Sequence, residues 1–386
     1  MRISCNDRNP FRGMKMKTIK QKSKELTPEE IESFGNELES LRKEVLQKVG
    51  KSDEEYIRKV ESSVRYFEII GRLALHFGVD PFTYLAGVGA LSLSKIIDNM
   101  ELGHNVMHGQ YDWMNDPELN SEKYEWDIVS EKSQWILSHN YFHHSFTNII
   151  GKDYDFGYTI MRLTSDQKWS IFNLFQVQLN ILLATFFEFG VAFHGHGIQK
   201  EHSLTGSEVT EAEKKEADNR LFLKIAKQIG KDYVLFPLLG GLQAPRILMG
   251  NFTANIIRNL WTYSIIFCGH FTEDSVTYPL SSLDNETKGQ WYLRQLHGSS
   301  NLEGGKAFDF LSGNLSHQIE HHLFPDIPAN RYAEVGEKVK EIAKKYEQNY
   351  NTGSFFSQFT NVIKRIVAFS FPDEIAKNLY TETKYA

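Results

Sequence analysis

The chain has 386 residues, 41% of them hydrophobic, and a formal net charge of -6 at pH 7. This acidic balance argues against a nucleic-acid-binding protein, which usually presents a basic face. Only two cysteines are present, Cys5 and Cys268, and their wide separation excludes a disulfide framework and a cysteine-based zinc module.

Residues 1–65 are predicted to form a charged cytosolic N-terminal arm and helix, without the apolar stretch of a secretory signal. Lysines ahead of the first apolar block favour a cytoplasmic location for this N-terminal segment, because positive charges beside a membrane segment tend to stay on the cytoplasmic side. Thr27 followed by Glu30 has the pattern of a capping box and predicts a surface helix over about 26–62. The lysines of the basic arm are Lys15, Lys17, Lys20, Lys22 and Lys24.

Three apolar blocks follow this segment. The first, at 66–97, is interrupted by Asp80-Pro81, which predicts two helices joined by a tight turn, either in the membrane or buried in a soluble core. The second, at 169–193, has about the 20 residues needed to cross a bilayer. Its single acid, Glu188, must then face protein or water.

The third block, at 233–271, is long but broken by glycines and a proline. We expect 251–267 to cross the membrane and 233–250 to lie along the interface or re-enter. An even number of crossings in the second and third blocks keeps the histidine clusters described below on one side. The blocks together predict an all-α protein, in which residues 66–325 form about four membrane spans and a cytosolic helical cap.

Residues 326–386 are predicted to form amphipathic cytosolic helices, at about 329–346 and 354–369. Apolar side chains recur at helical spacing in the second of these stretches. The pattern fits a stripe that packs on the core and equally a helix that lies on the membrane surface.

The histidines carry most of the information about function. There are fourteen, and the clustered ones stand just outside the apolar blocks. Histidines four apart on a helix share one face, so such a pair can bind one metal ion or flank two. An adjacent histidine points about a quarter-turn away and can reach a second ion. The clusters are His104 with His108; His139, His143 and His144; His270; and His321 with His322.

This donor set favours two metal ions. Imidazoles suit iron, zinc, copper or nickel, and the clusters contain no cysteine for an iron–sulfur site. A structural zinc needs only four ligands, fewer than the clusters offer. We expect ordinary polar roles for His76, His202 and His297, and no ligation by His194 or His196, although these two can support the ligands.

Five polar residues near the clusters are expected to orient the ligands, because a ligating imidazole usually donates its other N–H to a carboxylate or carbonyl. The alternative is that they lie in loops on a solvated surface. They are Asp98, Glu101, Asp153, Asp155 and Asn314.

At these residues the chain resembles the membrane fatty-acid desaturase family, over roughly residues 66–330. The distinctive blocks are HNVMHGQYDWMND at 104–116, SHNYFHH at 138–144, IRNLWTYSIIFCGHF at 257–271 and GNLSHQIEHHLFP at 313–325. The resemblance implies that the family's three histidine boxes are His104 with His108, then His139 with His143 and His144, then His321 with His322. It also implies that His270 is the additional ligand at the end of the last spanning helix.

One position departs from many family members. The third box often begins with His, whereas this chain has Gln318, as in front-end desaturases and some bacterial acyl-CoA desaturases. The resemblance leaves open whether Gln318 binds metal through its amide oxygen or leaves a site free, with the adjacent His317 as a rival ligand. The HPGG haem motif of a fused cytochrome b5 does not occur in the sequence. A separate electron donor is therefore implied, such as ferredoxin, flavodoxin or cytochrome b5 with a reductase.

The resemblance further implies an integral membrane enzyme with two iron ions at its cytoplasmic face. It would use O2 and two electrons to introduce a cis double bond into a long acyl chain, carried as acyl-CoA or acyl-lipid. An apolar tunnel past the metals would then select the reacting carbon. Trp113, Trp126, Trp135 and Trp261 are candidates for the tunnel wall or for packing.

Two other functions remain open on the sequence. A membrane di-iron hydroxylase of alkyl or fatty-acid chains uses the same kind of ligands, although the QIEHH motif favours a desaturase. A histidine-rich metal carrier would line a membrane path with histidines, whereas these clusters stand outside the apolar blocks.

Overall fold

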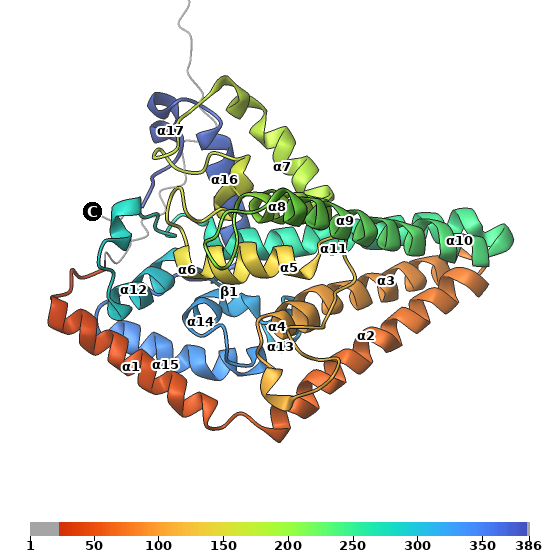
Figure 1. The fold of residues 1–386 in the computed structure, drawn as a ribbon, viewed down its shortest axis with the longest axis horizontal. Helices are drawn as coiled ribbons and strands as arrows, with labels where there is room; N and C mark the ends of the chain where they lie inside the picture. Colours follow the sequence, from red (N-terminus) through yellow and green to blue (C-terminus); the bar gives the residue numbers. More distant parts are fainter. Residues whose placement is uncertain (1–22, 384–386) are drawn as a thin grey trace, which may run out of the picture.

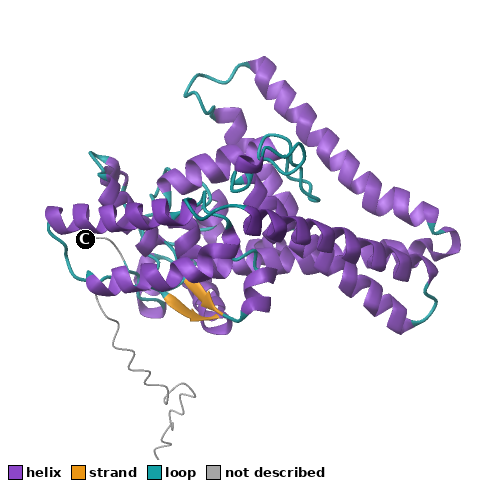
Figure 2. Ribbon diagram, turned by 90° about the horizontal axis from the view of Figure 1, so that it is seen from below, coloured by secondary structure: helices purple, strands orange, loops and turns teal. Residues whose placement is uncertain are grey.

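The computed structural model describes residues 23–383, and helices dominate this part of the chain (Figures 1 and 2). Within it, β1 (Asn301–Glu303) and β2 (Thr352–Ser354) pair in parallel, with Asn301 opposite Thr352. The all-α fold class is confirmed at this level. Most lysines of the predicted basic arm lie outside the described residues.

The predicted N-terminal helix is in fact two helices. α1 (Pro28–Leu46) begins at the predicted capping box, in which Thr27 and Glu30 exchange hydrogen bonds. The prediction of one helix over 26–62 is wrong, because the chain turns at 47–50 and α2 (Lys51–Phe77) starts after Gly50. α2 then continues into the first apolar block.

The first apolar block forms the predicted hairpin of α2 and α3 (Pro81–Ile97), which lie side by side (Figure 1). The carboxylate of Asp80 accepts hydrogen bonds from the backbone N–H groups of Phe82 and Thr83, which caps α3. A Cβ on Gly71 would lie 2.8 Å from the backbone nitrogen of Leu91, so glycine permits the close approach of the two helices.

The second apolar block is bent. η5 (Ile171–Phe175) and α7 (Gln176–Thr185) lead into α8 (Phe187–Glu201). Among residues 23–383 no single helix has both the length and the apolarity to cross a bilayer. The segments 171–185 and 187–201 are long and apolar enough when taken together, with a bend of 103° between them. Glu188 is buried and pairs with Arg258 at 2.6 Å, so the acid faces protein as predicted.

The third apolar block begins with short turns and continues as one long helix. After α9 (Glu211–Ile229) come η6 (Gly230–Leu235), α10 (Phe236–Leu239), η7 (Gly241–Gln243) and α11 (Ala244–His270). The predicted start of the long helix at 251 is too late. Pro245 stands in its first turn, where the missing N–H breaks no helical hydrogen bond.

Shorter helices form the rest of the molecule, and those from α4 to α6 and from α12 to α15 lie on the side of the molecule where α3 and α11 reach their C-terminal ends (Figure 1). The remaining elements are η1 (Asp98–Gly103), α4 (His104–Met107), η2 (Asp112–Met114), α5 (Lys132–Trp135), η3 (Ile136–His143), α6 (His144–Phe146), η4 (Phe156–Thr159), η8 (Leu280–Leu283), α12 (Lys288–Gly298), α13 (Lys306–Leu311), η9 (Leu315–His317), α14 (Gln318–Leu323), η10 (Ala329–Arg331), α15 (Tyr332–Lys345), α16 (Phe355–Phe369) and α17 (Asp373–Leu379).

The two predicted C-terminal helices correspond to α15 and α16. Val362 and Ile366 of α16 are buried in the same hydrophobic cluster as Phe267 of α11. Phe356, on another side of α16, is 81% exposed. α16 therefore packs on the core and also leaves apolar surface uncovered.

Candidate metal centre

Four segments that are far apart in the sequence bring their histidines together. They are α4, η3 with α6, the end of α11, and α14. The side chains form overlapping groups in which the ligand nitrogens lie within 4.8 Å of one another. The groups are His104, His108, His139 and His321; His143, His270 and His322; and His144, His321 and His322.

In the first group the ring nitrogens converge. Nε2 of His104 lies 3.2 Å from Nε2 of His108 and 3.4 Å from Nε2 of His139. Nε2 of His321 is buried and has no hydrogen-bond partner among residues 23–383.

The second group converges in the same way. Nε2 of His270 lies 3.3 Å from Nε2 of His143 and 3.1 Å from Nε2 of His322. His144 belongs to the third group and stacks on His322, with ring centroids 4.3 Å apart. Neither ring nitrogen of His144 has a hydrogen-bond partner in the described part of the chain.

This arrangement fits bound metal ions. Buried polar atoms without partners cost free energy, and a cation at the centre of each group would satisfy several of them at once. Burial holds the pKa values of His104, His108 and His144 well below the ordinary value, so these rings are neutral, as metal ligation requires. The all-imidazole donor set suits iron, zinc, copper or nickel, and it exceeds the four ligands of one tetrahedral zinc.

Two carboxylates orient the second histidine cluster. Nδ1 of His139 donates to Asp155 at 3.1 Å, and Nδ1 of His143 donates to Asp153 at 3.0 Å, which leaves both Nε2 atoms free to face the centre. Burial lowers the pKa of His143, but the Asp153 carboxylate more than offsets it, so the net pKa is raised. His194 donates to the other oxygen of Asp155 at 2.9 Å and so supports a ligand without joining the groups.

The other predicted orienting residues lie elsewhere. Asp98 accepts a hydrogen bond from the hydroxyl of Tyr124 at 2.9 Å. Glu101 accepts from the hydroxyl of Tyr56 at 2.7 Å and from the amide of Asn314 at 2.9 Å. These contacts brace the segment that carries the first histidine cluster instead of touching the ligand rings.

Two ligand partners were not apparent from the sequence. The hydroxyl of Tyr332 lies 3.3 Å from Nδ1 of His321, and Oε1 of Gln295 lies 3.1 Å from Nδ1 of His322. They come from α15 and α12, and no local spacing relates them to the third box.

Gln318 lies against the second group. Its Nε2 is 3.0 Å from Nε2 of His270, and its Oε1 is buried without a partner among the described residues. Exchanging the two amide atoms would present Oε1 to the same point. His317, the rival ligand, belongs to none of the groups, and its ring lies 3.9 Å from the carboxylates of Asp309 and Glu320.

The histidines expected to be ordinary polar residues have partners outside the groups, and so does His196, which was expected not to ligate. His76 lies 2.7 Å from a backbone carbonyl of its own helix, and His202 lies 2.8 Å from a tyrosine hydroxyl. His196 lies 2.8 Å from a carboxylate on α9, and His297 lies 3.4 Å from a serine hydroxyl.

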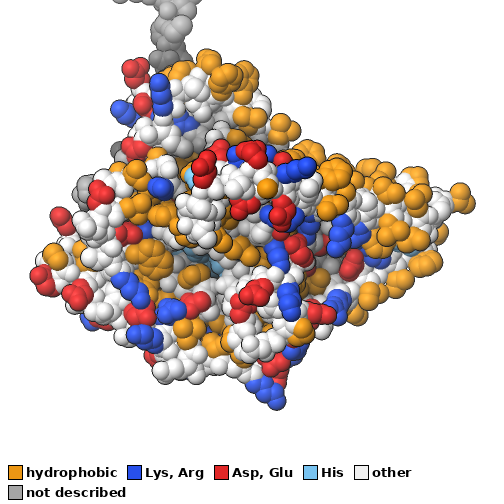
Figure 3. Space-filling view, viewed as in Figure 1, with side chains coloured by type: hydrophobic (Ala, Val, Ile, Leu, Met, Phe, Trp, Pro, Cys, Tyr) orange, Lys and Arg blue, Asp and Glu red, His pale blue; other side chains and the backbone are white. Residues whose placement is uncertain are grey.

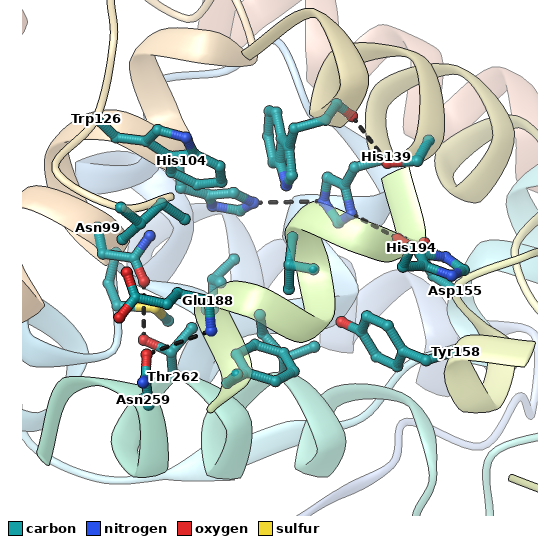
Figure 4. Close-up of a pocket in the computed structure, with 18 of the residues that line it drawn as sticks. Asn99, His104, Trp126, His139, Asp155, Tyr158, Glu188, His194, Asn259 and Thr262 are labelled. Atoms are coloured by element: carbon teal, nitrogen blue, oxygen red, sulfur yellow. Dashed lines mark hydrogen bonds and ion pairs between the residues drawn. The ribbon is translucent and has the colours of Figure 1, made fainter. Parts of the chain in front are cut away.

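A largely apolar pocket adjoins the histidines (Figure 4). His104 and His139 stand on one of its sides, and Tyr158 and Phe187 contribute aromatic wall. Asn99, Glu188, Asn259 and Thr262 form a polar corner on the side of the pocket opposite Asp155 and His194 in Figure 4.

Two of the four candidate tryptophans line this pocket, namely Trp126 and Trp135. The ring of Trp135 also stacks on His139, with centroids 4.6 Å apart. Trp113 is 41% exposed, and Trp261 packs on the ring of Phe308, so these two have other roles.

Comparisons with known proteins agree with this geometry. The sequence model of the family described as "Fatty acid desaturase" matches residues 81–354, which include every histidine of the groups. The "NADPH-dependent stearoyl-CoA 9-desaturase" of Mycobacterium tuberculosis (strain ATCC 25618 / H37Rv) is 41% identical over 360 residues, covering 92% of this chain and 83% of the relative.

More distant relatives carry related names. The "sn-1 linoleoyl-lipid 6-desaturase" of Synechocystis sp. (strain ATCC 27184 / PCC 6803 / Kazusa) is 23% identical over 274 residues, covering 69% of this chain and 74% of the relative. "Fatty acid desaturase 3" of Bos taurus is 32% identical over 84 residues, covering 22% of this chain and 19% of the relative.

The matched region spans the converging histidines and all the residues that line the pocket, and the similarity extends along nearly the whole chain. The chain therefore belongs to the fatty acid desaturase family, and it is an oxidoreductase that introduces double bonds into fatty acyl chains.

Proposed function

We propose that the chain is a membrane-bound di-iron desaturase that uses O2 and two electrons to form a cis double bond in a long-chain acyl-CoA. The observation that carries this proposal is the convergence of the histidine groups beside a largely apolar pocket. In the overall reaction, O2 takes up two hydrogens from the acyl chain, two electrons and two protons, and two waters form.

The histidine groups suggest the ligands of each ion. The first group surrounds one centre and the second group surrounds the other, while His144 lies close to both and Gln318 can complete the second set. Bound iron would supply the oxygen chemistry that removes hydrogen from neighbouring methylenes. The proposed ligands are His104, His108, His139 and His321 for the first ion and His143, His270 and His322 for the second.

The pocket supplies binding and position. Each methylene that it removes from water contributes about 0.8 kcal/mol, which favours a long acyl chain over a short one. Trp135, Tyr158 and Phe187 can hold the chain in a fixed path beside the histidines and exclude water from it. The carbon that lies next to the metal centre in this path is then the one that reacts.

The choice of acyl-CoA follows from the relative that is 41% identical, whose printed name is a stearoyl-CoA 9-desaturase. An acyl-lipid remains the alternative substrate, since the relative from Synechocystis sp. bears the name of a lipid desaturase. We expect a saturated long-chain acyl-CoA and a new double bond at position 9.

Exposed apolar side chains support a membrane location. They gather at the end of the molecule formed by α2, α3, α10 and α11 (Figure 3). Side chains at this end include Phe77, Val79, Phe82, Leu238 and Leu242, whose exposed fractions range from 73% to 102%. Apolar surface on this scale marks a membrane or protein contact.

The proposed organisation places residues 66–325 in the membrane domain and its cytosolic cap. Residues 1–65 and 326–386 then form cytosolic segments on either side of it in the sequence. We retain about four spans and a cytoplasmic metal centre as parts of the proposal, with α2 from residue 66 onward, α3, the bent pair and α11 as the membrane helices.

A separate carrier is proposed to deliver the electrons: a ferredoxin, a flavodoxin or a cytochrome b5 with its reductase. The relative named as NADPH-dependent makes a reductase that oxidises NADPH a reasonable source of these electrons.

The proposal is tested by expressing the chain in a host of known lipid composition and locating new double bonds by mass spectrometry. We expect a product that is two hydrogens lighter than its substrate. His321→Ala should abolish this product without changing the amount of protein in the membrane fraction, whereas His317→Ala should retain it. A product that gains one oxygen would instead identify a hydroxylase, and a variable load of zinc or copper without any product would identify a metal carrier.

A further inference from the structure

The loop at 153–169 carries both carboxylates that orient the second histidine cluster. It also contains three successive residues with left-handed backbone: Gly157 at φ 71°, Tyr158 at φ 53° and Thr159 at φ 60°. Residues other than glycine adopt this conformation only where the surroundings hold them in place. Tyr158, in the middle of this turn, lines the pocket (Figure 4).

The C-terminal strap, defined as residues 355–383, supplies such restraints. Arg365 donates from Nε to the carbonyl of Leu163 at 2.7 Å. Gln176 donates to the carbonyl of Ile366 at 2.6 Å, and Trp169 donates to the carbonyl of Ser370 at 3.0 Å. The hydrogen bonds to Leu163 and Trp169 lie on the C-terminal side of the turn, and the hydrogen bond of Gln176 lies beyond the loop.

Further contacts hold the rest of the loop. Arg162 forms an ion pair with Asp373 and donates to the carbonyl of Phe371 at 3.2 Å. Near the end of the strap, Glu382 accepts a hydrogen bond from the hydroxyl of Ser165 at 2.8 Å. The contacts therefore reach from α16 through α17 to the last described residues.

Arg365 connects this loop to a second part of the metal centre. Its Nη1 donates to the carbonyl of Thr272 at 3.1 Å, and Thr272 follows His270 by two positions. Arg365 is 1% exposed, and its guanidinium carbon lies 5.7 Å from the ring centroid of Phe156, inside the loop. One buried cation therefore bridges the backbone of the loop and the end of α11.

The strap is not part of the family match, which ends at residue 354. α16 nevertheless packs against α7 and against α11, which ends at His270 (Figure 1). The contacts of the strap with the loop thus lie outside the segment that defines the family.

We propose that Arg365 is a positioning residue of the metal centre. Through the strap it fixes the loop that carries Asp153 and Asp155 and the end of α11 that carries His270. This inference rests on the proposed metal centre. It assigns the orientation of ligands in both histidine groups to a residue that contacts none of them.

The test compares four variants of the full-length protein in detergent with the wild type. Arg365→Gln removes the bridging cation, Arg365→Lys retains a charge that can reach one carbonyl, and Glu382→Ala releases the far end of the strap. Lys364→Gln is the matched control, because Lys364 is the neighbouring cation on α16 and is exposed. Two quantities are measured: iron retained against a competing chelator, and amide hydrogen exchange peptide by peptide.

For Arg365→Gln we expect iron affinity to fall by about 10-fold or more, as for other residues that orient metal ligands. Peptides over 153–165 should exchange faster, whereas peptides from α1 and α15, which share a separate hydrophobic cluster, should keep wild-type rates. Arg365→Lys should recover part of both effects. Glu382→Ala should speed exchange around 164–165, and Lys364→Gln should match the wild type.

Wild-type iron retention and wild-type loop exchange in Arg365→Gln would overturn the inference, as would equally faster exchange in every peptide. If Arg365→Gln does not fold, Glu382→Ala decides, and unchanged loop exchange in that variant counts against the strap. A wild-type protein that binds no iron would refute the proposed function instead, while the exchange of the loop would still test the strap.

Discussion

At the scale of single residues, the contacts of Nδ1 set the direction of several ligand rings. Asp153 and Asp155 hold His143 and His139 so that Nε2 of each ring faces the centre. Tyr332 plays a comparable part for His321. A ring without such a partner would need to be ordered by the metal itself.

The Asp155→Asn variant tests this orientation. The amide can donate a hydrogen bond to Nδ1, which would place the ring proton of His139 on Nε2. Nε2 would then present an N–H to the centre in place of a lone pair. We expect iron affinity to fall by about 10- to 100-fold. Asp218→Asn is the control, because Asp218 contacts His196, away from the groups. Equal iron retention in the two variants, measured by chelator competition, would contradict the assigned orientation.

Gln318 and His317 are distinguished by a second pair of variants. Because Gln318 lies against His270 with a buried, unpartnered oxygen, Gln318→Leu should weaken the second iron and leave the first in place. His317→Ala should retain both, since His317 stands outside the groups. Loss of iron in His317→Ala, with retention in Gln318→Leu, would reverse the assignment. Iron per chain measured by plasma mass spectrometry decides the outcome.

Much of the candidate site was predictable because its signals are local. The histidine spacings and the nearby Asp153 and Asp155 all lie within short stretches of sequence. Tyr332 and Gln295 could not be predicted in this way, because they reach the third box from other helices. Asp98 and Glu101 were assigned to the ligands by proximity in sequence, but their carboxylates turn toward tyrosine hydroxyls.

At the scale of elements, π-helical turns accompany the first two histidine boxes. η1 stands immediately before α4, and η3 contains His139 and His143. The wider turn of a π-helix changes the faces that successive residues share, and such turns are frequent at functional sites. His104 and His108 join one group, whereas His139 and His143, at the same spacing, join two. A spacing of four residues is compatible with both arrangements, so the sequence alone did not distinguish them.

The corner between α1 and α2 is held by a buried ion pair. Asp53 is 0% exposed, accepts a hydrogen bond from the Gly50 N–H at 2.9 Å and pairs with Arg331 at 2.6 Å. Burial raises the pKa of Asp53, but Arg331 and Asn330 more than offset it, so the net pKa is lowered. This ion pair ties α2 to η10 beside the third histidine box.

The Asp53→Asn variant should lower the free energy of unfolding by about 2–3 kcal/mol, because Arg331 loses its buried partner. Since the folded pKa is depressed, the contribution of Asp53 is present above about pH 4 and is lost as the pH falls through the folded value. Glu55→Gln is the control, because Glu55 is exposed and lies 3.9 Å from Lys51. Thermal unfolding in detergent at pH 7 checks the difference, and equal unfolding temperatures would contradict it.

At the scale of the whole molecule, long-range packing decided the features that the sequence left unclear. The hairpin at Asp80 was predictable because its cap and proline are adjacent. The bend of 103° between α7 and α8 was not, because the block is apolar on both sides of it. Glu188 beside this bend pairs with Arg258 of α11, a partner that no local pattern identifies.

One helix, α11, connects the pocket to the metal centre. α11 contributes Asn259 and Thr262 to the polar corner of the pocket and ends at His270. At a rise of about 1.5 Å per residue, Thr262 stands about 12 Å along the helix from His270. An acyl chain lying along α11 would therefore extend from the metal centre toward a wall of paired polar groups.

The iron content of the purified protein tests the central claim most directly. We expect two irons per chain in the wild type, and about one in each of His108→Ala and His143→Ala, because these ligands belong to different groups. The measurement combines plasma mass spectrometry for the metal with amino-acid analysis for the protein. A single zinc per chain in the wild type, or the same full metal content in all three proteins, would contradict the account.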